Sequence, residues 1–329
     1  MRAVLVKEFG GPEVLRVGTA DLRPMGEDDV HVRVAYAGVN FLDLHHRSGA
    51  YERPLPFVPG REGAGTVLAC GAAVTHLSPG DRVAFAMHDD GTYGEEAVLP
   101  ARKVARVPDD VDMRTAAAVM LQGLTALSLV AVEARISPGQ TVLVHSAAGG
   151  TGSLIVQVAR HAGARVLGLA STEEKVAAAL RAGASAAGTY PEGGFAPWVR
   201  EQTDGRGVDV VFDAVGGPTF AGDLDSLAVR GRLIVYGRSG GPFPPLDPAR
   251  LANGCLSLTY SRLSYYTGTF ADFQERAAAL FDLVSRGAVA PLELTVMPLA
   301  EASVAHAALA ARTSLGKHVL DLAEESATP

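Results

Sequence analysis

A glycine-rich turn between two apolar segments carries the clearest chemical signal in the sequence. Thr141-Val-Leu-Val-His leads into Ser146-Ala-Ala-Gly-Gly-Thr-Gly152, and an apolar-periodic run to Ala162 and an apolar segment at 165–170 follow. The order strand, turn, helix, strand places a dinucleotide pyrophosphate on a helix N-terminus. Glycines let the backbone approach phosphate where a Cβ would collide. An ordinary glycine-rich loop is the alternative, but the flanking elements favour phosphate contacts at Ala147, Gly149, Gly150 and Gly152.

The end of the second apolar segment indicates which dinucleotide is bound. In NAD-binding units an Asp or Glu about 20 residues past the glycines binds the ribose 2′-hydroxyl, but here the strand ends Ala170-Ser-Thr172 without an acid. The Ser171 or Thr172 hydroxyl can instead donate to a 2′-phosphate, and Lys175 lies one turn further. Ser171 and Glu174 are expected to form the capping box of the next helix. The pattern favours NADPH over NADH, although Lys175 would equally fit a solvated surface position.

Composition and charge narrow the classes of function. The 329 residues are 48% hydrophobic and 20% charged, as in a globular protein, and their number suggests two domains. The formal charge is −7 without a basic stripe, so no nucleic-acid partner is expected. Neither a signal peptide nor an uninterrupted run of about 18 apolar residues is recognised, so no membrane segment is expected. Two cysteines cannot staple a chain of this size, and they fit a cytoplasmic location.

The elements that must position the turn are of two kinds. Residues 1–110 hold short strands punctuated by Gly and Pro, which predicts a compact β-barrel-like module. From residue 141 strands and helices alternate, which predicts an α/β domain with a parallel sheet and helices on both faces. The predicted strands are 141–145, 165–170, 208–212 and 232–236, and the predicted helices are 113–134 (broken at Gly123), 153–162, 173–182, 219–229 and 270–284.

Segments along nearly the whole chain resemble one known family. They are Gly38–Asp43, Arg47–Tyr51, Val58–Gly65, Gly91–Glu95, Gln122–Ala126, the glycine-rich turn, Val208–Gly217 and Gly316–Leu320. The chain resembles the medium-chain dehydrogenase/reductase superfamily and, within it, the zinc-independent quinone oxidoreductases related to zeta-crystallin. The resemblance implies a GroES-like catalytic domain at 1–122 and 264–329, a Rossmann domain with a doubly wound parallel sheet at 123–263, and a cleft between them. It also implies a homodimer in which Rossmann sheets meet edge to edge.

The metal-ligand positions of the superfamily favour its zinc-independent members. Zinc-dependent relatives hold the catalytic metal with two Cys and one His, whereas the matching positions here are Asn40, Arg61 and Gln122. Two amides and a guanidinium make a poor zinc site, so no metal is expected, and neither is alcohol oxidation, which needs a Lewis acid. The remaining chemistry is hydride delivery from NADPH to a small quinone or α,β-unsaturated carbonyl, where negative charge delocalises onto oxygen.

The segment Asn40–Tyr51 supplies three candidates for catalysis. The Asn40 amide would donate to the substrate oxygen or satisfy the loop backbone. Tyr51 would donate there or supply a proton, or pack with its hydroxyl in water. His45 stands where several relatives carry Tyr and would titrate near neutral pH, or act as a surface histidine. Two acids are expected to pair with an arginine: Asp43 and Glu62, with Arg61 or Arg47.

The resemblance extends the cofactor site beyond the turn. It implies that Lys175, Tyr190 and Arg312 surround the adenosine phosphate. Thr125 and the strand end that holds Gly237 and Ser239 are expected beside the nicotinamide. Two other functions stay open: an enoyl-thioester reductase, which uses the same conjugate reduction, and an NADPH-binding structural or regulatory protein with little catalysis.

Overall fold

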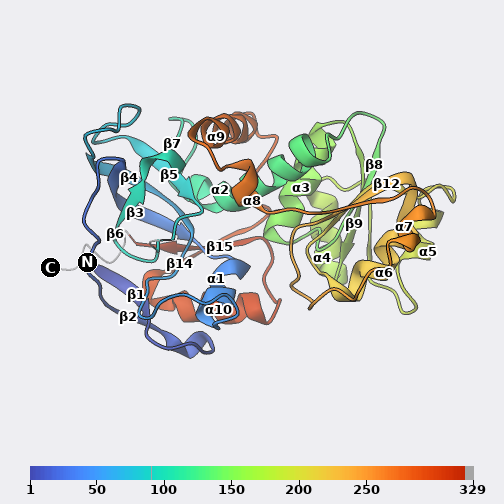
Figure 1. Ribbon diagram of the computed structural model, residues 1–329, viewed down its shortest axis with the longest axis horizontal. Helices are drawn as coiled ribbons and strands as arrows, with labels where there is room; N and C mark the ends of the chain where they lie inside the picture. Colours follow the sequence, from blue (N-terminus) through green and yellow to red (C-terminus); the bar gives the residue numbers. More distant parts are fainter. Residues whose placement is uncertain (90, 323–329) are drawn as a thin grey trace. The chain divides into compact units, whose positions relative to one another are not determined.

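The computed structural model describes residues 1–89 and 91–322 and contains two compact units (Figure 1). The first unit joins Met1–Leu124 to the segment that begins at Ser264, and the second unit is Thr125–Leu263. The chain therefore leaves the first unit once and later returns to it.

A seven-stranded sheet forms the centre of the first unit. Its order is β14-β15-β3-β4-β5-β7, with β6 paired to β3, and only the pairing of β14 with β15 is parallel. Val30, Val32 and Val34 alternate along β3 and are buried, which fixes the register of this strand against the core. The strands of this sheet are β3 (Asp29–Gly38), β4 (Glu62–Cys70), β5 (Arg82–Ala86), β6 (Glu96–Pro100), β7 (Val104–Arg106), β14 (Leu294–Pro298) and β15 (Lys317–Asp321). Strands β1 (Arg2–Val6) and β2 (Leu15–Thr19) form a separate antiparallel pair.

Helix α2 (Met113–Leu127) runs through Gly123, so the predicted break at this glycine is wrong. A Cβ at Gly123 would lie 2.6 Å from Leu280 Cδ1 of α9, which explains the glycine as a close packing contact rather than a helix end. A π-helical segment, Ser128–Glu133, follows α2. The other helices are α1 (Phe41–Arg47), α8 (Leu263–Tyr266), α9 (Phe270–Ser285) and α10 (Ala302–Ala310), with 3₁₀ turns at Pro12–Val14, Ala101–Lys103 and Leu299–Glu301.

The second unit is built on a six-stranded sheet whose pairings are all parallel. Its order is β10-β9-β8-β11-β12-β13, so the chain winds outward from β8 and then returns to the other side of β8. The four predicted strands are present, and the sequence did not indicate two more at the sheet edges, β10 and β13. The strands are β8 (Thr141–Val144), β9 (Arg165–Ala170), β10 (Ala186–Thr189), β11 (Val208–Asp213), β12 (Leu227–Val235) and β13 (Ser257–Tyr260).

Helix α4 begins at Glu173 as predicted, whereas α3 and α6 begin two or three residues earlier than predicted. Helix α3 begins at Gly150, so two turn glycines lie in its first turn. The capping box predicted for Ser171 and Glu174 is wrong: Thr172 is the N-cap of α4, and its Oγ1 accepts the Lys175 N–H at 3.2 Å. The helices are α3 (Gly150–His161), α4 (Glu173–Arg181), α5 (Ala196–Glu201), α6 (Gly217–Ser226) and α7 (Ala249–Ala252).

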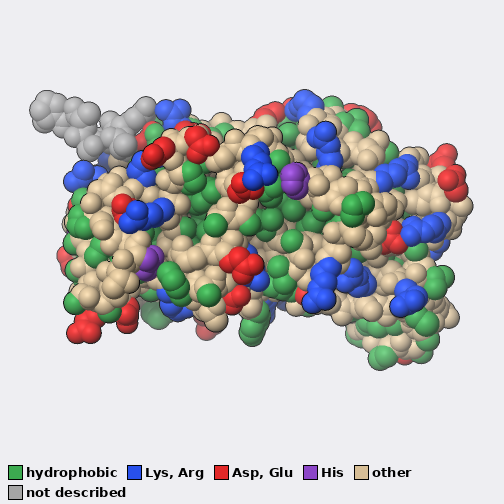
Figure 2. Space-filling model, turned by 90° about the horizontal axis from the view of Figure 1, so that it is seen from above, with side chains coloured by type: hydrophobic (Ala, Val, Ile, Leu, Met, Phe, Trp, Pro, Cys, Tyr) green, Lys and Arg blue, Asp and Glu red, His purple; other side chains and the backbone are tan. Residues whose placement is uncertain are grey.

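One helical stretch of the described residues, Met113–Glu133, is long and apolar enough to cross a membrane by length and composition. Because 67% of its most apolar window is buried in the structure, it has the character of a core helix. On the face shown in Figure 2, basic and acidic side chains of the described residues are interspersed rather than gathered by sign.

Candidate functional site

Four side chains from separate elements of the first unit form a group, buried except for the half-buried Gln122, which we name the Glu62 network. Asn40 precedes α1, Glu62 begins β4, Gln122 lies in α2 and Lys317 begins β15. The Asn40 amide nitrogen donates to Glu62 Oε1 at 2.7 Å, and Asn40 Oδ1 accepts from Lys317 Nζ at 2.8 Å and Gln122 Nε2 at 3.2 Å. Lys317 also forms an ion pair with Glu62, and neither of these two side chains is more than 2% exposed. The network is thus internally charge-balanced.

Asp43 in α1 extends the network toward the first unit's core. Its Oδ2 accepts the Asn40 N–H at 2.8 Å and the Tyr93 hydroxyl at 3.2 Å, while its Oδ1 is buried without a partner among the described residues. Burial raises the pKa of Asp43 to about 7, despite these hydrogen bonds and the nearby Lys317 ammonium. The Tyr93 hydroxyl also contacts His306 Nε2 at 3.1 Å.

The expected pairing of Asp43 and Glu62 with an arginine is wrong. Arg61 instead binds Asp89 at 2.5 Å, and Arg47 donates to the Gly10 carbonyl at 3.2 Å. The cation at Glu62 is Lys317, which the sequence did not single out because it is 255 residues away along the chain. A lysine that opens an apolar strand was the available signal, since buried lysines are rare unless they are paired.

The structure brings two of the three candidate catalytic side chains together. The ring centroids of His45 and Tyr51 are 5.1 Å apart, and Tyr51 is 37% exposed. Asn40 is only 4% exposed, and its amide is engaged by Glu62. The second Asn40 N–H is 3.5 Å from the Gly38 carbonyl, so direct donation to a substrate would require release of a contact.

The ends of the parallel strands gather most predicted cofactor residues at one edge of the second unit's sheet. The turn residues Ala147, Gly149, Gly150 and Gly152 follow β8, Ser171 and Lys175 follow β9, Tyr190 follows β10, and Gly237 and Ser239 follow β12. The winding direction reverses between β8 and β11, and nucleotides bind at such a switch point. Thr125, near the end of α2, is the first residue of this unit, whereas Arg312 lies in the first unit, after α10.

The glycine-rich turn itself fits a pyrophosphate. Gly149 is the N-cap of α3 and makes no side-chain capping bond, so a helix N-terminus without a side-chain cap is available to an anion. A Cβ at Gly152 would lie 2.2 Å from the Ser146 carbonyl oxygen, so only glycine permits this close turn.

A second group, which we name the His145 network, adjoins the glycine-rich turn and consists of His145, Asp223 and Tyr190. His145 Nε2 is 2.7 Å from Asp223 Oδ1, and His145 Nδ1 is 3.1 Å from the Tyr190 hydroxyl, which accepts the Ser146 N–H at 3.2 Å. Burial alone would lower the pKa of His145, but the Asp223 carboxylate outweighs it and raises that pKa. Burial raises the pKa of Asp223 to about 6. Sequence reasoning missed His145 and Asp223, since a histidine at a strand end is not distinctive.

His145, Asp213 and Asp223 also offer potential metal-ligand atoms within 4.8 Å of one another. However, Asp213 already accepts the Val215 and Gly216 N–H groups at 2.6 and 3.1 Å and the Thr219 hydroxyl at 3.0 Å. Because these carboxylate oxygens already have partners in the protein, we assign no metal to this group.

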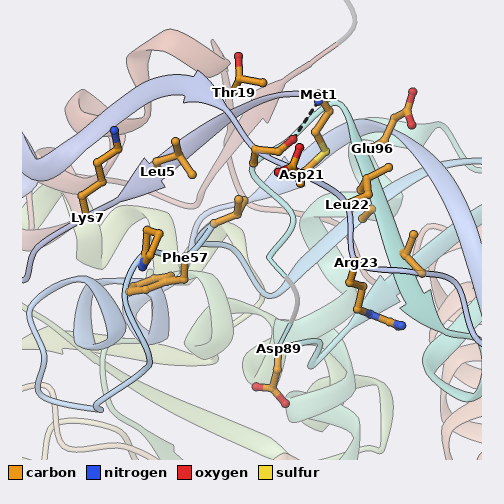
Figure 3. Close-up of a pocket in the computed structure, with 15 residues that line it drawn as sticks. Met1, Leu5, Lys7, Thr19, Asp21, Leu22, Arg23, Phe57, Asp89 and Glu96 are labelled. Carbon is orange, nitrogen blue, oxygen red and sulfur yellow. Dashed lines mark hydrogen bonds between the residues drawn. The ribbon is translucent and has the colours of Figure 1, made fainter.

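A pocket of about 460 Å³ in the first unit is lined by β1, the segment 19–23, residues 56–58 and β6 (Figure 3). None of the predicted site residues lines this pocket. Asp89 lies at its margin, with a carboxylate that points away from the other labelled side chains.

Comparison with known proteins places the chain in a family. An alcohol dehydrogenase GroES-like domain matches residues 26–109, and a zinc-binding dehydrogenase domain matches residues 150–283. The chain is 40% identical to a quinone oxidoreductase of Pseudomonas aeruginosa (95% of this chain, 97% of that protein) and 37% identical to a 2-haloacrylate reductase of a Burkholderia species (97% and 98%). The structure of an Escherichia coli quinone oxidoreductase complexed with NADPH is similar at a TM-score of 0.93 and 33% identity (98% and 100%).

These matches confirm the predicted fold class, a GroES-like unit with a Rossmann parallel-sheet unit. The model with the zinc-binding description matches residues 150–283, and the positions that the resemblance assigns to zinc ligands, Asn40, Arg61 and Gln122, lie outside that match. The chain is an oxidoreductase, and it belongs to the zinc-independent quinone oxidoreductase family of the medium-chain dehydrogenase/reductase superfamily.

Proposed function

We propose that this oxidoreductase uses NADPH to reduce quinones or α,β-unsaturated carbonyl compounds without zinc. The observation that carries the proposal is the Lys317 ammonium, 2.8 Å from the Asn40 oxygen at a position that matches a zinc ligand. Lys317 Nζ already donates to this oxygen, so the oxygen is not free to bind a metal, and the guanidinium of Arg61 at a second such position is not a metal ligand. Acceptors whose own oxygen takes up the developing charge are therefore the substrates that fit.

The residues of the second unit support NADPH as the cofactor, which supplies a hydride when it is bound. The α3 N-terminus and its glycines would hold the pyrophosphate. Ser171, Lys175, Tyr190 and Arg312 would surround the adenosine phosphate, and Thr125, Gly237 and Ser239 would border the nicotinamide. Lys175→Ala is expected to raise the Kd of NADPH more than that of NADH. An equal loss for both nucleotides would remove Lys175 from the phosphate site.

In the first unit we assign Tyr51 as the hydrogen-bond donor to the substrate oxygen and His45 as the ring that orients it. Asn40 acts as a positioning residue, because its amide ties the start of α1 to β4 and β15. The acceptor gains the hydride and one solvent proton, so that an enone becomes a saturated carbonyl and a quinone becomes a hydroquinone. The Tyr51 hydroxyl stabilises the oxygen on which charge develops.

A panel of acceptors tests this function directly. NADPH oxidation is measured with 1,4-benzoquinone, 2-cyclohexenone and an enoyl thioester. Turnover of the first two is expected, and Tyr51→Phe should lower kcat about 100-fold with a smaller change in KM. Exclusive turnover of the thioester would assign an enoyl-thioester reductase. Tight NADPH binding without turnover of any acceptor would point to a structural or regulatory protein.

We also propose a cytoplasmic homodimer that forms through β13. This strand is at the edge of the six-stranded sheet, and its Leu258 and Tyr260 are 37% and 52% exposed. An exposed edge with apolar side chains favours pairing with a second strand. Sedimentation should give a dimer at micromolar concentration and a monomer for Leu258→Lys. A monomeric parent protein would contradict the proposal.

A further inference from the structure

Helix α1 is tied to helix α10 by a closed group of four buried side chains, which we name the α1 clamp. The two helices lie side by side in the first unit (Figure 1). Asp43 and Arg47 lie one turn apart on α1, Tyr93 lies between β5 and β6, and His306 lies in α10. None of the four residues is more than 6% exposed. Burial of so many polar groups is costly unless they pair with one another.

The contacts of the α1 clamp run from one end of α1 to the other by way of α10. Arg47 Nη1 is 3.3 Å from His306 Nδ1, and His306 Nε2 is 3.1 Å from the Tyr93 hydroxyl. That hydroxyl donates to Asp43 Oδ2 at 3.2 Å, and the same oxygen accepts the Asn40 N–H at 2.8 Å. The clamp therefore holds both the first turn and the last residue of the helix.

The direction of each hydrogen bond in the clamp follows from the donors. Arginine has no acceptor atom, so His306 Nδ1 accepts from Arg47 and the ring proton lies on Nε2. Burial and the Arg47 charge lower the pKa of His306 to about 3, so the neutral ring has this one N–H. It donates to the Tyr93 oxygen, and the Tyr93 O–H then donates to Asp43. His306 and Tyr93 each donate to the next residue, so neither side chain can turn without breaking the next bond.

The clamp sets which way the opposite side of α1 faces. His45 is two residues from both Asp43 and Arg47, and two residues correspond to about 200° around a helix. The half-buried His45 therefore lies on the side of α1 away from the clamp. Tyr51 follows the helix, and its N–H donates to the His45 carbonyl at 3.1 Å. A rotation of α1 would move these two residues together with Asn40, the N-cap.

We propose that Tyr93 and His306 are positioning residues for the reaction, because they fix the rotation of the helix that carries the acceptor-binding side chains. Neither residue touches the acceptor, and both act through Asp43 and Arg47 on the two ends of α1. The inference rests on the proposed function, because the roles of Asn40, His45 and Tyr51 are assigned there.

The variant Tyr93→Phe tests the clamp with little change in packing. The ring keeps its volume but no longer bridges His306 and Asp43, so kcat for 1,4-benzoquinone should fall about 10-fold, because small displacements of reacting groups are costly. The KM of the quinone should change less than about 3-fold, since the loss is one of orientation rather than of binding. The Kd of NADPH should not change, because no residue of the clamp is among those proposed to hold the cofactor.

Two substitutions of His306 separate hydrogen-bond direction from packing. Glutamine can accept from Arg47 through its oxygen and donate to Tyr93 through its nitrogen, so His306→Gln should keep about a third or more of the parental kcat. His306→Leu has neither group and should lose about 10-fold. Val83→Ala, a buried substitution in β5 outside the clamp, should lower the Tm without lowering kcat. Equal losses of kcat in the Gln and Leu variants, or a similar loss in Val83→Ala, would overturn the positioning role.

The ¹⁵N NMR spectrum of the histidine rings tests the clamp without any acceptor. The His306 signals, assigned by comparison with His306→Gln, should show the neutral Nε2–H tautomer, and Tyr93→Phe should shift them. A charged ring or an Nδ1–H tautomer would overturn the clamp whatever the activity. If the parent protein reduces no acceptor, the proposed function fails and the positioning role fails with it, even with the expected tautomer. If acceptors are reduced and Tyr93→Phe leaves kcat unchanged, the positioning role is wrong and the proposed function stands.

Discussion

The two units each bury a carboxylate against a cation, but the cations differ in kind. In the Glu62 network the cation is the Lys317 ammonium, and Asn40 and Gln122 complete the contacts. In the His145 network the partner of Asp223 is an imidazole, whose pKa the Asp223 carboxylate raises against the effect of burial. One oxygen of Asp223 is also buried without a partner among the described residues. The first network is thus a fixed frame, and the second can exchange a proton.

The largest effect is expected when the Glu62 network loses its cation, Lys317. Lys317→Met leaves the Glu62 charge buried and uncompensated, so the free energy of unfolding should fall by about 3–5 kcal/mol. Urea unfolding, with hydrogen exchange of the β3, β4 and β15 amides, measures the loss in the first unit. The double variant Lys317→Met with Glu62→Gln should recover at least half of it. A double variant no more stable than the single one would show that charge balance is not what the network provides.

Asp43 shows that the first unit also contains a buried carboxyl group whose protonation depends on pH. Its pKa is raised from 3.8 to about 7 by burial, so the folded state keeps a proton that the unfolded chain releases at lower pH. The stability of the parent protein, relative to Asp43→Asn, should therefore fall as the pH rises from about 4 to about 7, by at most about 4 kcal/mol. Urea unfolding at several pH values measures the difference. A pH-independent difference would contradict the raised pKa.

The sequence predicted the elements of the second unit better than the buried contacts of either unit. The alternation of strands and helices fixed β8, β9 and β11 closely, because period and turn chemistry are local properties. The break predicted at Gly123 was wrong because this glycine allows the close approach of Leu280, a residue far away along the chain. Lys317 and Asp223 were missed for the same reason: a side chain's partner is set by the fold rather than by its sequence neighbours.

Two glycines of the glycine-rich turn are expected to differ in their effect on NADPH binding, because the space around them differs. A Cβ at Gly152 would lie 2.2 Å from the Ser146 carbonyl oxygen, whereas a Cβ at Gly149 would lie 3.1 Å from it. Gly152→Ala should therefore raise the Kd of NADPH about 30-fold, on the order of 2 kcal/mol of strain, and Gly149→Ala should cost much less. Fluorescence titration with NADPH measures both. Similar losses in the two variants would mean that the turn tolerates the shift.

The smallest effect is expected at the link between the His145 network and the turn. Tyr190→Phe removes the acceptor of the Ser146 N–H and the hydroxyl next to His145 Nδ1, so the Kd of NADPH should rise about 5-fold, for a loss of about 1 kcal/mol. A fixed frame would give the same ratio of Kd values at every pH. Because burial raises the pKa of Asp223 to about 6 and the Asp223 carboxylate raises the pKa of His145, the ratio between variant and parent should instead change as the pH passes about 6. In Asp223→Asn, the Kd of NADPH should depend less on pH than in the parent protein. A ratio of Kd values between Tyr190→Phe and the parent that stays constant with pH would show that the His145 network, like the Glu62 network, exchanges no proton.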